Sequence, residues 1–383
     1  SVDLHVDRCA VKSRLVVEHP NITIAGQTAP GGGICLADYS TVVKTDNVII
    51  RFLRFRLGDQ TEEQGDALSI SDSNNVIVDH VSASWSIDET LSVSGSNKVT
   101  VQWSIISESL DASHHNKGSH GYGSLVRGAN GAEYSFHHNL WAHHRSRTPR
   151  PGNYRNYKED PQGLTADFSN NAIYNWGGPW GAYNSDEDSI SRYNFRYNYF
   201  KAGPDSRRKS YIFREQCAKA KAHFVGNYYN GKAIGDDYGR VRFQFHKRFG
   251  KTKKEILKAY KQERPIDVAQ VSVETAADAF DHVLARAGAF PRDAVDRRVV
   301  KSVKNGTGKI IDSQKQVGGW PRLKTAEAAA AADRDHDGLP NHWETGHALD
   351  PANPADARRD HDGDGVTNLE EYLHERAEAL LAG

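Results

Sequence analysis

The chain lacks methionine, has only three cysteines and contains no long hydrophobic run in its 383 residues. A membrane-spanning helix needs about 18 consecutive apolar residues, and no stretch approaches that length, so we predict no membrane span. No signal peptide is recognised. Because methionine is missing, we expect the sequence to be a processed or trimmed fragment.

Charge of either sign is not in excess, since Lys plus Arg and Asp plus Glu both number 49. Electrostatics therefore give no reason to expect a nucleic-acid partner. Cys9, Cys35 and Cys217 cannot all pair, and three cysteines define no cellular compartment. Cys35 fits a small buried hydrophobe, although a Cys9–Cys35 disulfide stays open.

Helical periodicity is missing between residues 22 and 227, where short apolar pairs recur instead. In each pair the residues stand at i and i+2, so both side chains point to one face of a strand. Stretches rich in Gly, Asn, Ser and Asp separate the pairs. The eight pairs are Ile22/Ile24, Val48/Ile50, Val76/Val78, Val99/Val101, Tyr134/Phe136, Ala166/Phe168, Tyr193/Phe195 and Ala222/Phe224.

An asparagine follows each of the last four pairs at the same offset. Asn139, Asn171, Asn198 and Asn227 are separated by steps of 32, 27 and 29 residues. Steps of this length suit one full coil of a solenoid, whereas an antiparallel sandwich would show hairpin signals every 8–12 residues or so. We therefore predict an all-β parallel β-helix. Its stacked asparagines can satisfy one another, because an amide both donates and accepts.

The second predicted coil, residues 47 to 59, contains three arginines. Arg51, Arg54 and Arg56 alternate there with apolar residues. The alternation favours a solvated arginine face over a ligand site.

Carboxylates gather in the next coils. Asp66, Asp79, Asp88 and Glu89 lie one coil apart or less. Stacking can bring two or three of them together, and clustered carboxylates repel one another unless a cation joins them. A set of oxygen ligands suits Ca²⁺, which predicts a calcium site.

A histidine-rich, glycine-rich loop follows at residues 109 to 125. His114, His115, Lys117 and His120 suggest zinc, but their spacing matches no metal template and no cysteine is nearby. A loop that lines a substrate groove is the favoured interpretation.

Five segments stand in order and at suitable separations: G-D-A-L (65–68), V-I-V-D-H (76–80), D-E-T-L-S-V (88–93), H-H-N-L-W (137–141) and R-T-P-R (147–150). Together they resemble the pectate lyases of polysaccharide lyase family one, and the similarity spans roughly residues 20 to 235. The resemblance implies a right-handed parallel β-helix. It also implies cleavage of polygalacturonate by β-elimination with Ca²⁺.

The same resemblance implies roles for individual residues. Arg147, which opens R-T-P-R, corresponds to the family's base, and Arg150 to a group that binds a neighbouring carboxylate with its planar fork. The family's substrate-binding lysine is not at its usual place. Lys117 or His120 is our predicted substitute, and His120 is also an alternative base because histidine titrates near neutrality.

The family's calcium-ligand positions are only partly matched in this sequence. Asp66 and Asp88 match the family's first two acidic positions, but Ser92 stands at the third. Glu89 is the predicted replacement, and the alternative is that Ca²⁺ arrives mainly with the substrate. Farther along, Trp176 and Trp180, near Tyr183, either stack on sugar rings or pack over the coil ends.

Helical spacing returns only after residue 245. Residues 253–263 and 274–289 carry apolar residues at i, i+3 or i+4. We predict three domains: a catalytic β-helix (1–245), a helix-and-loop extension packed on it (246–325) and a calcium-loop module (326–383).

The module contains two copies of the twelve-residue calcium loop. Each copy has Asp at positions 1, 3 and 5, Gly at position 6 and Glu at position 12. The pattern resembles dockerin-like or thrombospondin-type calcium repeats, so we predict a structural or adhesive role. The predicted ligands are Asp333, Asp335, Asp337 and Glu344 in the first loop, and Asp360, Asp362, Asp364 and Glu371 in the second.

Together these features predict a monomeric lyase, secreted or periplasmic, that acts on an acidic polysaccharide and most of all on pectate. One alternative is a binding or adhesion β-helix without catalysis, which Ser92 keeps open. Another is a β-helix hydrolase, which would need paired catalytic carboxylates and would give no unsaturated product.

Overall fold

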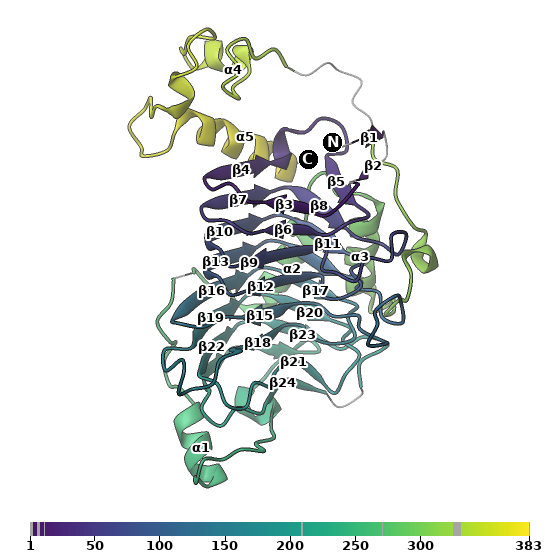
Figure 1. The fold of residues 1–383 in the computed structure, drawn as a ribbon, viewed down its shortest axis with the longest axis vertical. Helices are drawn as coiled ribbons and strands as arrows, with labels where there is room; N and C mark the ends of the chain where they lie inside the picture. The colour runs from purple at the N-terminus through teal and green to yellow at the C-terminus, as the bar shows by residue number, and fades with distance from the viewer. Residues whose placement is uncertain are drawn as a thin grey trace.

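The structure is a computed structural model that describes residues 3–5, 8–10, 12–207, 210–269, 271–324 and 331–382. Its main body is a stack of coils, each of which contributes short strands to three long sheets (Figure 1). The strand pairs are parallel throughout, except for β1 with β2 and β26 with β27. The predicted parallel β-helix is confirmed.

The first sheet contains all eight predicted strands in the predicted order. Ile22 pairs with Val48, Val48 with Val76 and Val76 with Val99, and the register continues through Tyr134, Ala166 and Tyr193 to Ala222. The strands are β4 (Ile22–Ala25), β7 (Val48–Arg51), β10 (Asn74–Asp79), β13 (Asn97–Gln102), β16 (Ala132–His137), β19 (Leu164–Ser169), β22 (Ser191–Arg196) and β25 (Lys221–Val225).

The predicted asparagine ladder is present at the turn that follows this sheet. The Nδ2 atoms of Asn139, Asn171 and Asn198 each donate to Oδ1 of the next asparagine, at 3.1, 3.0 and 3.1 Å. All four side chains are buried. Each amide also donates to a backbone carbonyl, as Asn139 does to Val101, so the ladder satisfies polar groups that water cannot reach.

The second sheet was not predicted from the sequence. Its strands are β1 (Asp3–His5), β2 (Arg8–Ala10), β5 (Ile34–Ala37), β8 (Leu53–Arg56), β11 (Ser82–Ser84), β14 (Ile105–Ser107), β17 (Leu140–Ala142), β20 (Ala172–Tyr174), β23 (Tyr199–Lys201), β26 (Tyr228–Tyr229) and β27 (Lys232–Ala233).

The third sheet faces the candidate site and continues into a small fourth one. Its strands are β3 (Leu15–Val17), β6 (Thr41–Val43), β9 (Leu68–Ser71), β12 (Leu91–Ser94), β15 (Leu125–Arg127) and β18 (Arg150–Gly152), followed by β21 (Trp180–Asn184), β24 (Tyr211–Glu215) and β28 (Val241–Phe243).

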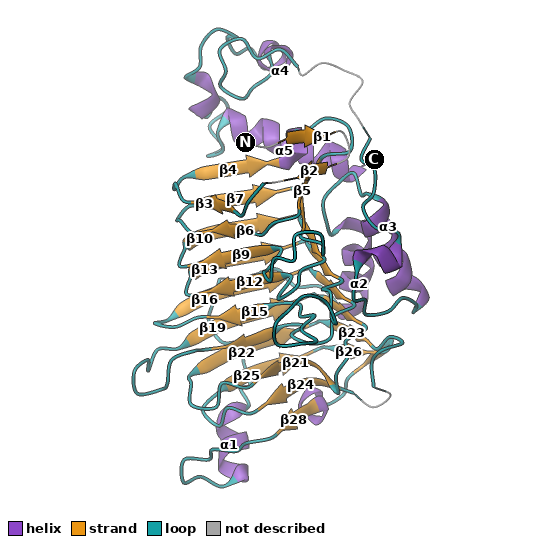
Figure 2. Cartoon of the chain, turned by 45° about the vertical axis from the view of Figure 1, so that its right-hand side comes forward, coloured by secondary structure: helices purple, strands orange, loops and turns teal. Residues whose placement is uncertain are grey.

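Helices cover the stack at its side and ends (Figure 2). The two predicted helices are confirmed as α1 and α2, whereas the sequence analysis missed α3. The division into three domains stays a prediction. The helices are α1 (Lys253–Tyr260), α2 (Ala276–Arg286), α3 (Ala294–Asn305), α4 (Asn341–Gly346) and α5 (Asn368–Ala382), with short 3-10 turns η1 (Gly26–Thr28), η2 (Asp237–Arg240), η3 (Gln314–Val317) and η4 (Asp356–Arg358).

The predicted solvated arginine face is wrong for two of its three members. Arg54 and Arg56 are 0% and 1% exposed, and Arg56 binds Asp293 and Asp296 at the start of α3. The chain bends at Phe52 between β7 and β8, so alternation along one strand does not continue into the next. These buried ion pairs fasten α3 to the second sheet.

Two further predictions concern the cysteines and the membrane. Cys35 and Cys217 are buried free thiols, and the Cys9 side chain lies outside the described residues. Within the described residues, no helix is both long and apolar enough to cross a membrane.

Candidate active site

The candidate site lies where successive coils enter the third sheet. Asp66 comes just before β9, Glu89 before β12 and Arg147 before β18. Glu89, Tyr122 and Ser146 are in register on adjacent coils, joined by parallel bridges. Residues far apart in the sequence therefore meet, as the predicted stacking requires.

Three predicted calcium ligands form one cluster. Asp66, Asp88 and Glu89 each place a carboxylate oxygen within 4.8 Å of the other two. The backbone N–H of Glu89 donates to Oδ1 of Asp66 at 3.1 Å, which holds the two coils together. Burial, with the charge of Asp88, raises the pKa of Asp66 to about 7.

The cluster fits a hard divalent cation. All its donors are carboxylate oxygens, which Ca²⁺ prefers, and three carboxylates converge on one place. Ser92, at the family's third acidic position, lies beside Asp66 and lowers its pKa. Ser92 brings no carboxylate to the cluster, and Glu89 supplies the third carboxylate instead.

Arg147 adjoins this cluster. Its guanidinium forms an ion pair with Glu89 and lies over the ring of Tyr122, 4.1 Å from the ring centroid. Burial is the main cause that lowers the pKa of Arg147, and the Arg150 guanidinium acts in the same direction. Tyr183 and Asp88 oppose that shift.

The histidine-rich loop supplies a second group around Asp88. Nε2 of His120 lies 3.0 Å from Oδ1 of Asp88, and the His115 ring stacks on His120 at 3.8 Å. Burial lowers the pKa of His120 and outweighs the opposite effect of Asp88. Lys117 is exposed, and only its backbone N–H, which donates to Nδ1 of His115, contacts this group.

That backbone hydrogen bond bears on the zinc hypothesis. Asp88, His115 and His120 are close enough to share a metal. Nδ1 of His115 accepts from the backbone N–H of Lys117, and Nε2 of His115 lies 3.7 Å from Oδ2 of Asp88, which is beyond hydrogen-bonding distance. The interpretation as a groove-lining loop stays a prediction.

Basic side chains continue from Arg147 along the coils. Arg150 and Arg127 both bind Asp186, and Arg150 does so at 3.1 Å. Arg214 stacks over Trp180 at 4.0 Å from the ring centroid. Such a surface suits a polymer with a carboxylate on each sugar.

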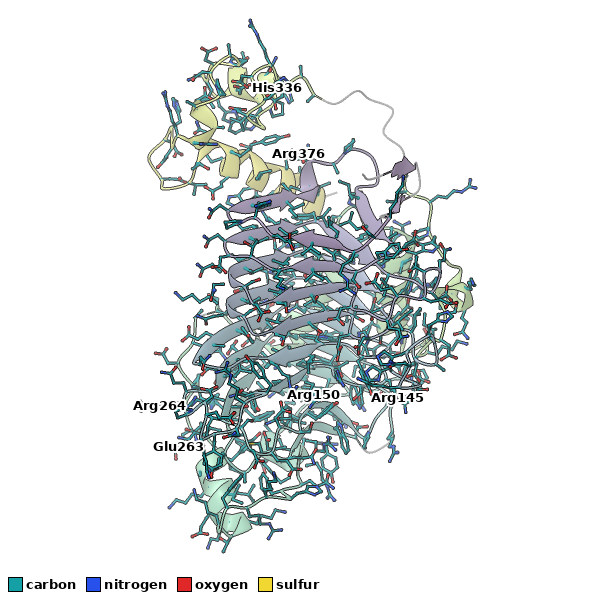
Figure 3. All side chains as sticks on the ribbon, in the orientation of Figure 1. Arg145, Arg150, Glu263, Arg264, His336 and Arg376 are labelled. Atoms are coloured by element: carbon teal, nitrogen blue, oxygen red, sulfur yellow. The ribbon has the colours of Figure 1, made fainter. Side chains whose placement is uncertain are left out.

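The two predicted aromatic residues have different environments. Trp176 is 0% exposed and packs edge-on against Phe200, so the prediction that it stacks on a sugar is wrong. Trp180 is partly exposed and lines a cavity of about 540 Å³ together with Tyr122, Arg145 and Arg207. Figure 3 shows Arg145 and Arg150 on the coil stack, away from His336 in the C-terminal module.

The predicted calcium loops of the C-terminal module are separate from this site. Asp333, Asp335 and Asp337 form one acidic group and Asp360, Asp362 and Asp364 another. Glu344 joins Asp337 in a further group, completed by a residue that the sequence analysis missed, Asp356. Glu371 belongs to no group among the described residues.

Sequence reasoning also missed Tyr122, Arg127, Asp186 and Arg214. Tyr122 lies within the histidine-rich segment, three residues before β15. No sequence motif pointed to it. The other three residues stand on coils where no motif drew attention.

Comparison with known proteins places the chain among relatives of one kind. No family model matches it. It is 33% identical over 379 residues to a probable pectate lyase C of Aspergillus flavus, covering 95% of this chain and 80% of that protein. The corresponding protein of Aspergillus oryzae is 32% identical with the same coverage.

A solved structure supports the fold. The major allergen from cedar pollen superposes with a TM-score of 0.50 at 15% identity, covering 74% of this chain and 78% of that one. The identity with the Aspergillus proteins and its span over nearly the whole chain settle the kinship: the chain belongs to the pectate lyases.

Proposed function

We propose that the chain cleaves pectate by β-elimination, with Arg147 as the base. The observation that carries this proposal is the position of Arg147, half-buried over Tyr122 and adjoining the Asp66–Asp88–Glu89 cluster. The relatives of this chain are probable pectate lyases, which supports pectate as the substrate.

The reaction needs a proton removed from C5 of a uronate, next to its carboxylate. The C5–H electrons form the C4–C5 double bond, the C4–O bond breaks, and the leaving oxygen takes up a proton. A calcium ion held by Asp66, Asp88 and Glu89 would supply positive charge that neutralises the substrate carboxylate.

Arg147 must be neutral to accept the proton. Arginine ordinarily has a pKa of about 12.5 to 13.8, so only a small fraction is neutral in water. Burial and the nearby Arg150 lower the pKa of Arg147, which is the direction the base needs. Glu89 favours the charged form, so the guanidinium has to exchange that ion pair for the substrate.

The neighbouring arginines bind the polymer. Arg150, oriented by Asp186, offers a planar fork to a uronate carboxylate, and Trp180 with Arg214 offers an aromatic and cationic surface on the next two coils. His120 is the alternative base, since its lowered pKa keeps the imidazole neutral near pH 7.

The remaining assignments belong to the same proposal. We place the chain in polysaccharide lyase family one, with calcium as its metal, a three-domain organisation, and a location outside the cell or in the periplasm. The motif R-T-P-R and the oxygen-only cluster support the family and the metal.

The test is ultraviolet absorbance during incubation with polygalacturonate, with and without a calcium chelator. Lyase products carry a conjugated double bond, so absorbance should rise and the chelator should stop the rise. Release of reducing ends without absorbance would replace the lyase by a hydrolase. Binding without either signal would leave only the adhesion function.

A further inference from the structure

We propose that the first C-terminal loop is a calcium site that Asp356 closes from outside the loop, and that metal binding there fixes the helix which caps the first coil of the solenoid. The expected ligand is a hard divalent cation. This inference is independent of the lyase reaction.

The five carboxylates come from three separate elements. Asp333, Asp335 and Asp337 stand in the loop, Glu344 stands on α4, and Asp356 begins η4, twelve residues after Glu344. Asp333, Asp335 and Asp337 have oxygens within 4.8 Å of one another, and so have Asp337, Glu344 and Asp356. Asp337 belongs to both groups and therefore joins them into one site.

Several of these oxygens are buried without a hydrogen-bond partner in the described residues. Glu344 is 0% exposed and both its oxygens lack a partner, as do both oxygens of Asp335 and one each of Asp337 and Asp356. Leaving a buried carboxylate unsatisfied is costly, since the group loses its hydration. A cation is the partner that these converging anions lack.

The other oxygens are already used to orient the site. Asp333 accepts from the backbone N–H groups of His336 and Gly338, and Oδ1 of Asp337 accepts from Leu339. Oδ2 of Asp356 accepts from the backbone of Asp350 at 3.1 Å. Asp337 and Asp356 therefore each use one oxygen for the backbone, and the other oxygen of each has no hydrogen-bond partner in the described residues.

The two loops differ in burial. Glu344 of the first loop is 0% exposed, whereas Asp360, Asp362 and Asp364 of the second loop are all exposed. Glu371 belongs to no group of carboxylates among the described residues. We expect the first loop to bind calcium more tightly than the second.

The site is connected to the solenoid through α5. The side chain of Asn368, in the first turn of α5, donates to the Asp356 carbonyl at 2.8 Å, and Nε1 of Trp343 donates to Glu375 at 2.7 Å. Gln27 of η1 in turn donates to the carbonyl of Leu373 at 3.4 Å. Figures 1 and 2 show α5 beside β4 at the end of the stack where the chain begins.

An apolar contact completes the connection. Leu369 and Leu373 of α5 line a cavity with Ile49 and Ile77, which project from the outer face of the first sheet. Ile77 is 41% exposed, so α5 shields only part of that face. A metal that joins Glu344 to Asp356 would hold α4 and η4, and through them α5, in the capping position.

The experiment measures terbium luminescence of the full-length chain, sensitised by Trp343, which adjoins Glu344, and its displacement by Ca²⁺. An Asp66→Asn background removes the contribution of the active-site cluster. Asp356→Asn should weaken the tighter site about tenfold or more, because calcium affinity follows the number of charged ligands. The matched control, Asp362→Asn in the exposed second loop, should change it by less than about twofold.

Equal affinity of the Asp356→Asn variant and the parent, or an equal loss in the Asp362→Asn variant, would overturn the site. The cap is tested separately by hydrogen exchange of α5 with and without Ca²⁺. Exchange should slow with Ca²⁺ in the parent and stay fast in Asp356→Asn. Exchange that is insensitive to Ca²⁺ in both would overturn the capping role, while circular dichroism establishes that both chains are folded.

Discussion

The active-site cluster and the first C-terminal loop both collect carboxylates, three in the former and five in the latter, but balance their charges differently. In the active site, Arg147 pairs with Glu89, so the chain itself supplies part of the positive charge. In the loop, the oxygens of Glu344 have no hydrogen-bond partner among the described residues. Both clusters raise a carboxyl pKa to about 7, at Asp66 and at Glu344.

This difference in charge balance indicates a different role for each cluster. A cluster that is already partly neutralised by an arginine can exchange partners during a reaction, whereas one with no counter-charge depends on a resident ion. Glu215 illustrates a third solution, because it is buried and burial raises its pKa to about 8. A bound proton, and not a metal ion, then neutralises the buried Glu215 carboxylate.

The largest effect should come from removing the arginine. Arg147→Ala should lower the lyase rate by about 10³-fold, the usual scale for loss of a catalytic base. It should also make the Asp66 cluster bind calcium more tightly, because its built-in counter-charge is gone. Product absorbance and calcium titration measure the two effects.

The matched control for that variant is Arg192→Ala on β22, whose side chain contacts the carbonyl of Gln162. It should keep the parental rate. A rate for Arg147→Ala within tenfold of the parent would show that another group, with His120 first among the candidates, takes the proton.

Chelation should give the next largest effect. Removing calcium should lower the rate by about 10²-fold or more, because the metal's charge stabilisation is worth several kcal/mol. Asp66→Asn should raise the calcium concentration needed for half-maximal rate, and Asp362→Asn should not. A chelated enzyme with full activity would mean that Arg147 and its neighbours supply all the positive charge that the reaction uses.

Substitution of Arg150 tests whether this residue binds substrate or only balances the charge of Asp186. Arg150→Ala should raise KM about tenfold with a smaller change in kcat, since a hydrogen bond to a charged group contributes about 1.5–3 kcal/mol. Arg150→Lys should recover part of the loss, because it keeps the charge but not the fork. An unchanged KM would indicate that Arg150 serves only to balance Asp186.

The smallest effect concerns Glu215 and pH. Its folded-state pKa of about 8 exceeds the ordinary 4.5, so the folded state binds the extra proton and stability falls as pH rises from about 5 to 8. Glu215→Gln should remove that fall, which we expect to amount to about 2–4 °C in Tm. Thermal melts at pH 5, 7 and 9 measure it, and parallel curves for parent and variant would contradict the assignment.

The first sheet was predictable because an apolar pair recurs on each of its eight strands, and an asparagine follows the last four pairs at one offset. The second and third sheets were not, since strands of three or four residues, such as β11 and β14, carry too little pattern. Arg54 and Arg56 were misjudged because their partners, Asp293 and Asp296, lie more than 200 residues away. Long-range ion pairs leave no local signal.

The candidate site shows the same limit. Asp66, Asp88, Glu89 and Arg147 were predicted through motifs that stand in order along the chain, and the structure brings all four together. Tyr122 was not predicted because its role depends on the register between adjacent coils. Asp356 was not predicted because it lies in a turn outside the twelve-residue loop pattern. For Trp176 the sequence left sugar stacking and packing open, because the same local sequence allows the side chain to face inward or outward, and the structure buries it.

The asparagine ladder carries a consequence for how long such a molecule can be. Asn227 donates to Oδ1 of Asp237 at 3.0 Å, and a carboxylate accepts but passes no hydrogen bond onward. The hydrogen-bonded asparagine ladder thus ends at Asp237, which cannot donate to a further side chain. An added coil with asparagine at the same offset, inserted between Asn198 and Asn227, would lengthen the solenoid, whereas one inserted after Asp237 would find no hydrogen bond to extend.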